Sequence, residues 1–98
     1  MKPIRNEIVA VSTTSKEIVA DLEGLEQRMD LIIRNTSPNA TDIITLSLGR
    51  NAAIANAGIV LRQNEVFLNS TDISNPCWSG AIQSICATAT GQLSIMEK

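Results

Sequence analysis

The chain has 98 residues, a net charge of −2 and no histidine. This length builds a single domain, and the scattered basic residues do not form the cluster that a nucleic-acid partner requires. Without histidine the Ser-His and Cys-His pairs of nucleophilic catalysis are excluded and the commonest general base is missing, so we expect that the protein is not an enzyme.

The first residues predict a short arm followed by a strand. Residues 1–7 are expected to form an N-terminal arm, and residues 8–98 a single domain. Ile8–Val11 is short and rich in β-branched residues, which is typical of a strand. The polar run Ser12–Ser15 supplies the turn that ends it.

The segment 15–29 has two interpretations. Apolar residues from Ile18 to Met29 repeat with the spacing of a helix, with Ser15 as its cap. Gly24 interrupts this pattern, and the acidic residues around it fit a solvated loop that follows a strand over 16–20. We favour the strand and loop, because the rest of the chain is β-rich, and we keep the helix as the alternative.

The middle of the chain predicts a hairpin. Met29–Asn35 and Asp42–Leu48 both alternate apolar and polar residues, and turn-forming residues around Pro38 separate them. Three Asn-x-Ser/Thr triplets, at Asn35, Asn39 and Asn69, predict that these stretches are exposed loops or loop edges.

The second half predicts short strands joined by polar turns. An Ala- and Asn-rich connection over 50–57 precedes them. The expected strands are 58–61, 66–69, 78–87 and 93–96. Seven to eight short strands with regular turns predict an all-β fold, either a small antiparallel β-sandwich or a jelly-roll-like barrel.

The side chains that usually carry chemistry are sparse. Cys77 and Cys86 are nine positions apart, farther along a strand than a disulfide can reach, and two thiols without histidine are poor metal ligands. We therefore expect no metal and no cofactor. Trp78 is interpreted as a core or interface residue, with an aromatic platform for a sugar or a protein as the alternative.

Composition and targeting signals point to a soluble component of an assembly. Phe67 and Trp78 are the only aromatic residues, so the core has few large side chains and is a candidate for stabilisation by neighbouring subunits. No apolar run approaches the ~18 residues of a membrane span. The start of the chain lacks the apolar region of a signal peptide, so we expect synthesis in the cytoplasm and no membrane partner.

Two-thirds of the chain resembles a family of small phage virion proteins. The matching segments are Arg28–Asn35 (R-x-x-L-x-I-x-N), Gly58-Ile59-Val60-Leu61, Asn64-Glu65-Val66-Phe67, Trp78-Ser79-Gly80-Ala81-Ile82 and Leu93-Ser94-Ile95-Met96-Glu97. The sequence departs from the family at Gln63-Asn64, where a Pro-Gly turn is usual. The resemblance implies a β-sandwich and a structural role in a virus particle.

The resemblance leaves the position in the particle open. A capsid decoration (cement) protein that binds and stabilises the assembled shell is favoured, in contact with the major capsid protein and as a homotrimer or homopentamer. The alternative is a vertex, head-fibre or tail module that binds a receptor or a glycan. The expected assembly contacts are Met1, Lys2, Pro3, Ile4, Arg5 and Trp78.

Overall fold

The computed structural model describes residues 5–20, 28–70 and 77–98. It contains eight antiparallel strands, and no helix occurs within these ranges. The strands are β1 (Arg5–Val11), β2 (Lys16–Val19), β3 (Asp30–Asn35), β4 (Ile44–Leu48), β5 (Ile59–Leu61), β6 (Val66–Ser70), β7 (Ile82–Cys86) and β8 (Gly91–Glu97).

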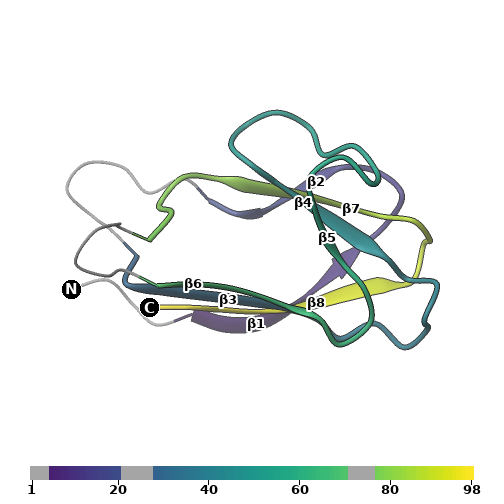
Figure 1. Cartoon of the computed structure of the whole chain (residues 1–98), viewed down its shortest axis with the longest axis horizontal. Coiled ribbons are helices and arrows are strands. Elements are labelled where there is room, and N and C mark those ends of the chain that lie inside the picture. The colour runs from purple at the N-terminus through teal and green to yellow at the C-terminus, as the bar shows by residue number, and fades with distance from the viewer. Residues whose placement is uncertain (1–4, 21–27, 71–76) are drawn as a thin grey trace.

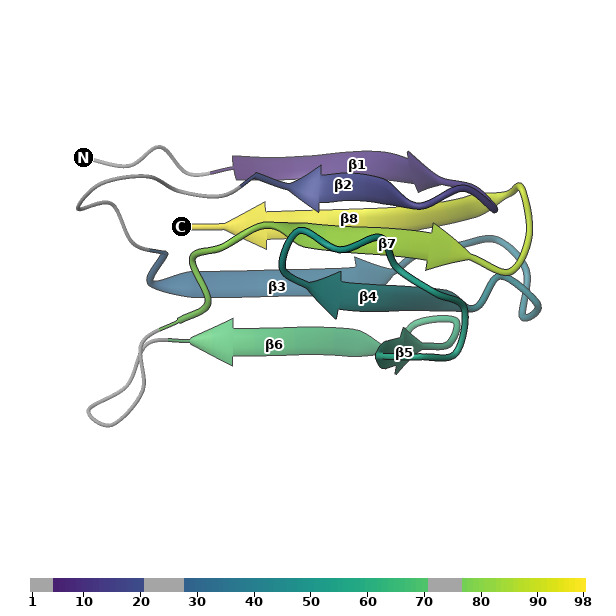
Figure 2. The same cartoon turned by 90° about the horizontal axis from the view of Figure 1, so that it is seen from above.

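The strands form two four-stranded sheets that pack face to face (Figure 1). One sheet has the order β1-β8-β3-β6 and the other β2-β7-β4-β5, and Figure 2 shows the strands of the second sheet lying in front of those of the first. The pairing is nested: β1 pairs with β8, β2 with β7, β3 with β6 and β4 with β5. This nesting is the strand order of a jelly roll, so the predicted all-β sandwich or jelly-roll-like fold is confirmed.

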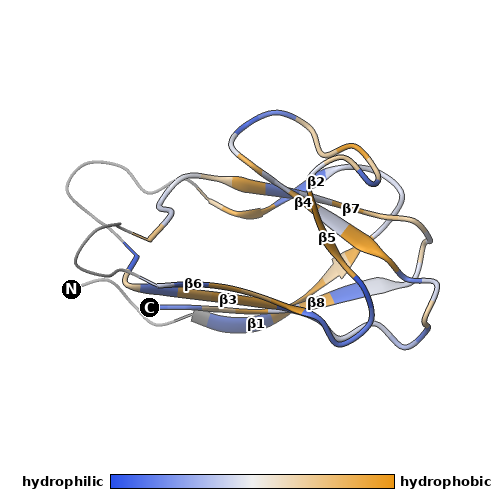
Figure 3. Ribbon diagram, viewed as in Figure 1, coloured by the Kyte–Doolittle hydropathy of each residue, from blue (hydrophilic) through white to orange (hydrophobic). Residues whose placement is uncertain are grey.

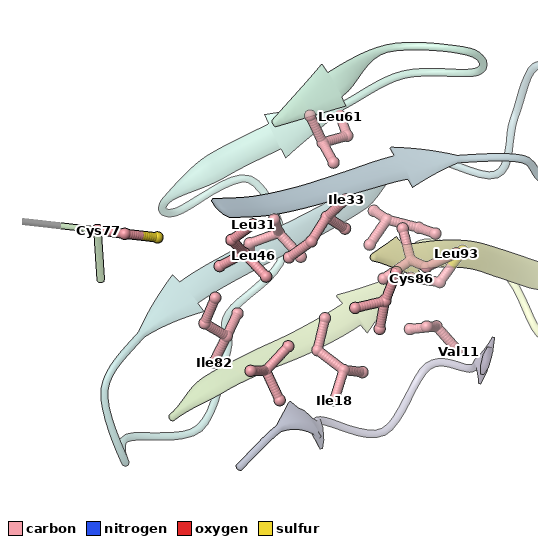
Figure 4. Packing of buried hydrophobic residues seen from close by; sticks show 13 residues of the cluster. Val11, Ile18, Leu31, Ile33, Leu46, Leu61, Cys77, Ile82, Cys86 and Leu93 are labelled. Atoms are coloured by element: carbon pink, nitrogen blue, oxygen red, sulfur yellow. The ribbon is translucent and has the colours of Figure 1, made fainter. Parts of the chain in front are cut away.

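The core lies between the two sheets and is built mainly from aliphatic side chains (Figure 4). Alternation in β3 and β8 points every second residue inward, including Leu31, Ile33, Leu93 and Ile95, all completely buried. Figure 3 shows apolar residues along β5 and β6 and a hydrophilic turn between these two strands, while β1 and β8 also carry hydrophilic residues. At ~25 cal/mol per Å² of buried apolar surface, this packing is the main favourable contribution to folding.

The predicted hairpin of 29–35 with 42–48 is wrong. β3 and β4 belong to different sheets, so they lie across the core from each other instead of sharing hydrogen bonds. The inward residues of the two strands are both large and apolar, and each set needs a facing layer to cover it. The connecting residues 36–43 carry the chain from one sheet to the other (Figure 1).

Several other predicted strands are present in the structure, but they begin or end at different residues. The favoured strand of the 15–29 segment is confirmed over Lys16–Val19, while residues 21–27 lie outside the described ranges. β1 begins at Arg5, so residues 5–7 of the expected arm are paired with β8. The expected strand 78–87 is shorter, because β7 begins only at Ile82.

The connection between β4 and β5 lies over part of the outer side of its own sheet (Figure 1). The backbone N–H of Asn56 donates to Thr45 Oγ1 at 3.0 Å, and that of Ala53 donates to Ser15 Oγ at 2.8 Å. Thr45 is therefore buried although its side chain points away from the core. The outer side of the other sheet has no such cover among the described residues.

Candidate assembly interface

Apolar side chains line up on the outer side of the sheet β1-β8-β3-β6. Ile32 in β3 is the direct partner of Met96 in β8 and of Leu68 in β6, so the three form one row across adjacent strands. In the next row Val66 lies beside Arg34 on β3 and Ile8 lies beside Ser94 on β8. We call the set Ile8, Ile32, Val66, Leu68 and Met96 the apolar face.

The apolar face is exposed to an unusual degree for its residue types. Ile8 is 66% exposed, Leu68 65%, Val66 49% and Met96 39%. Single exposed aliphatic residues are ordinary, but a contiguous group on neighbouring strands is typical of a surface that binds another protein. A hollow of about 460 Å³, lined by Asp30, Ile32, Met96 and Lys98, lies within the same face.

The sequence contained a signal for this surface. Ile32, Leu68 and Met96 are out of phase with the core residues of their own strands, so their side chains point outward. Which strands are neighbours, however, was not visible in the sequence. The predicted strand set therefore did not bring these three residues together.

The residues predicted to make assembly contacts are placed as follows. Met1, Lys2, Pro3 and Ile4 lie outside the described ranges, and Arg5 opens β1 opposite Glu97. Trp78 is 36% exposed, and its indole N–H donates to the carbonyl of Ala81 at 3.1 Å. The indole ring lies against Gly80, where a Cβ would come within 2.6 Å of it.

A buried arginine stabilises the end of the sandwich where Trp78 and Glu97 lie. The side chain of Arg28 is 1% exposed and forms an ion pair with Glu97 at the end of β8. Its guanidinium also donates to the carbonyls of Trp78 at 3.3 Å, Gly80 at 3.0 Å and Ala20. Three separate stretches of chain are thereby tied to one planar group, whose donors match such a set of acceptors.

Residues of three of the five motif segments meet at this arginine. Arg28 opens the R-x-x-L-x-I-x-N segment, Trp78 and Gly80 belong to the Trp-containing segment, and Glu97 ends the last strand. Each contributes to the same buried contact. The motifs therefore describe how the fold is held together.

A second polar network closes the opposite end. Asn35 is completely buried, and its side-chain amide donates to the carbonyls of Asp42 at 2.8 Å and Leu61 at 2.9 Å. Its side-chain oxygen accepts the backbone N–H of Ser37 at 3.0 Å. Asn35 was predicted to lie in an exposed loop or at a loop edge; it ends β3 at the edge of the 36–43 connection, but the expected exposure is wrong, because this asparagine links three segments inside the protein.

Asp42 is the ionisable group of this network. Its carboxylate accepts the hydroxyl of Thr88, the hydroxyl of Thr90 at 2.7 Å and the backbone N–H of Asn39 at 3.2 Å. These hydrogen bonds, the Thr88 bond first, hold the pKa of Asp42 below its usual value of 3.8, against the opposing effect of burial.

The depressed pKa of Asp42 predicts an acid dependence of stability. The ionised carboxylate stabilises the fold fully above the usual pKa of 3.8, and this contribution is lost as the pH falls below it toward the folded-state pKa. Urea unfolding of wild type and Asp42→Asn at a series of pH values measures it. The difference in unfolding free energy between the two should be largest near neutral pH and shrink in acid. A pH-independent difference would contradict this role.

The cysteines and the acidic residues assemble no reactive centre within the described ranges. Cys77 and Cys86 are both buried, lie well apart in the core region and form no disulfide (Figure 4). Over the same residues no three Cys, Asp or Glu side chains come together in an arrangement that would hold a metal ion. No helix in the described part of the chain has the length and apolarity to cross a membrane.

The surface that the geometry singles out for contact with another protein is thus the apolar face, and the buried polar residues Arg28, Asn35 and Asp42 have structural roles. Comparison of the chain with protein-family models, with curated proteins and with solved structures found no match.

Proposed function

We propose that this protein is a structural component of a phage or virus particle, and that it binds the assembled capsid shell as a decoration protein. The observation that carries the proposal is the nested jelly-roll strand order. Jelly rolls serve mainly as viral capsid proteins, as lectins and as cupins, so the choice among these roles depends on the side chains.

The side chains favour the virion role over the other two. A cupin-type metal site uses histidine, and the sequence has none. A sugar-binding surface stacks aromatic rings on the ligand, and this chain has only Phe67 and Trp78. The indole N–H of Trp78 is already bonded to the protein's own backbone, which leaves the receptor- or glycan-binding alternative with little support.

Binding to the assembled shell gives a decoration protein its effect by mass action. A subunit that binds the closed shell, and not the separated capsid proteins, lowers the free energy of the shell and raises its melting temperature. We place the shell contact at the end of the sandwich that carries the start of β1 and Trp78. A chain segment that precedes an edge strand can add to a neighbouring sheet or lie across a neighbouring subunit.

Co-sedimentation with capsid shells of the virus that encodes the chain tests this proposal. The full chain should move with the shells in a sucrose gradient and raise their melting temperature. Deleting residues 2–4 leaves β1 intact, whereas a deletion of 1–7 would also remove residues paired with β8. The shorter deletion should therefore weaken sedimentation with the shells while leaving the melting of the isolated protein unchanged.

Two outcomes would count against the proposal. A full chain that stays at the top of the gradient at saturating concentration contradicts shell binding. A truncated protein that sediments as well as the full chain contradicts the assignment of the contact to the N-terminal residues. Ile54→Asp, an exposed substitution in the β4–β5 connection, serves as the control that should bind normally.

A further inference from the structure

We infer that the apolar face is the contact between two copies of this chain, which pack their β1-β8-β3-β6 sheets face to face around a twofold axis. The inference concerns self-association and stands apart from shell binding, because it is measured without any shell. It also differs from the trimer or pentamer that shell symmetry would suggest.

The outer sides of the two sheets differ in how far the chain itself covers them. Part of the outer side of β2-β7-β4-β5 is covered by the β4–β5 connection, which buries Thr45 and bonds to it through the backbone N–H of Asn56. The outer side of β1-β8-β3-β6 keeps Ile8, Leu68 and Val66 about half or more exposed. A sheet face of this kind is stabilised when a second layer covers it, as in any sandwich.

The outward side chains of β3 carry charges that complement those of a second copy of the chain. Asp30, Ile32 and Arg34 all point outward, so an apolar residue stands midway between an acidic and a basic one. A twofold axis that crosses β3 at Ile32, perpendicular to the strand, places Asp30 of each copy opposite Arg34 of the other. The same operation places Ile32 on Ile32 and makes both ion pairs at once, which is the signature of an isologous contact.

Two further residues of the apolar face fit the same axis. Leu68 and Met96 share the row of Ile32, so each of them meets its own copy across the interface. Lys98 lies beside Asp30, where the two backbones exchange hydrogen bonds, and it faces Ser94 of the second copy. This arrangement opposes no like charges among Asp30, Arg34 and Lys98. The hollow beside Ile32 and Met96 accepts side chains of the opposing row.

The area of the face sets the expected affinity. Four strands ~4.8 Å apart and five to seven residues long at ~3.3 Å per residue cover roughly 19 Å by 20 Å. Two such faces bury roughly 800 Å², which is below the ~1,000 Å² of a stable specific interface and therefore describes a weak, reversible contact. We therefore expect a dissociation constant in the micromolar range, with monomers at high dilution.

Sedimentation equilibrium of the full chain from about 1 to about 500 µM tests the inference. The wild type should pass from the mass of one chain to twice that mass. Leu68→Asp sets two carboxylates against each other in the apolar row and should raise the dissociation constant more than ~100-fold. Ile54→Asp is the matched control, since Ile54 is 67% exposed and Leu68 65%, and it should dimerise like wild type.

A charge exchange tests the axis itself. Arg34→Asp places two carboxylates opposite each other on both sides of Ile32 and should weaken the dimer by about tenfold. The double variant Asp30→Arg with Arg34→Asp restores opposite charges across the axis and should recover most of the wild-type affinity. Circular dichroism melting of each variant at low concentration establishes that it is folded.

Several results would overturn the inference. A wild-type chain that remains a monomer at the highest concentration contradicts it, as does a trimer or pentamer. A dimer that survives Leu68→Asp contradicts the assignment to the apolar face. Failure of the double charge exchange to recover affinity lost in Arg34→Asp contradicts the twofold axis at Ile32.

Discussion

Replacing Arg28 with methionine is expected to lower the free energy of unfolding by about 3–5 kcal/mol. The arginine is 1% exposed and its guanidinium joins Glu97 to backbone carbonyls on two other stretches of chain. Methionine has a similar length but no charge and no donors. The substitution thus leaves the carboxylate of Glu97, which is 14% exposed, without its cation. It also leaves the carbonyl oxygens of Gly80 and Ala20 without the donors of the guanidinium.

Urea denaturation followed by the fluorescence of Trp78 measures this loss directly, since the tryptophan lies beside the arginine. Arg28→Lys keeps the charge but loses the planar set of donors, so it should cost about 2 kcal/mol. Arg62→Met removes an exposed arginine and should change stability by less than about 0.5 kcal/mol. If Arg28→Met unfolds at the same urea concentration as Arg62→Met, the buried contact does not form.

Asn35→Ala should be the second most destabilising change, with a loss of about 2–4 kcal/mol. The substitution removes two donated hydrogen bonds, to Asp42 and Leu61, and the acceptor of the Ser37 N–H. All of these groups are in the interior, where an unsatisfied donor or acceptor is expensive. Asn51→Ala, in the exposed connection between β4 and β5, is the control and should be close to neutral.

The isosteric variant Asn35→Asp distinguishes hydrogen bonding from packing. At neutral pH its carboxylate faces two carbonyl oxygens, which raises its folded-state pKa and destabilises the protein relative to wild type. As the pH falls below that raised pKa, the protonated carboxyl can donate again and the difference from wild type should shrink. A deficit that is equal at pH ~7 and pH ~4 would mean that shape alone matters at this position.

The fold was largely predictable because the strands alternate clearly. Leu31 and Ile33, or Leu93 and Ile95, fall on one side of a strand at a period of two, and polar turns separate the strands. The pairing was not predictable to the same degree. A short polar connection such as 36–43 fits a hairpin and a crossing between sheets equally well, and only the burial of both inward faces selects the crossing.

The burial of polar side chains could not be predicted from the sequence either. Arg28 and Asn35 carry no local sign that they are in the interior, and their residue types are usually exposed. Their positions follow from acceptors far along the chain, at Glu97, Gly80 and Leu61. The apolar face could not be predicted for the same reason. The row of Ile32 forms only because β6 and β8 flank β3 in the sheet.

A cryo-electron microscopy reconstruction of the virus particles in which we propose that this chain is a component tests the central claim most directly. We predict sandwich-shaped density at regular positions on the outside of the shell. We also predict that neighbouring copies meet through their β1-β8-β3-β6 sheets. Shells from a virus that lacks the gene should show no such density and should melt at a lower temperature. Identical reconstructions with and without the gene would contradict the claim that this jelly roll is a structural component of the particle.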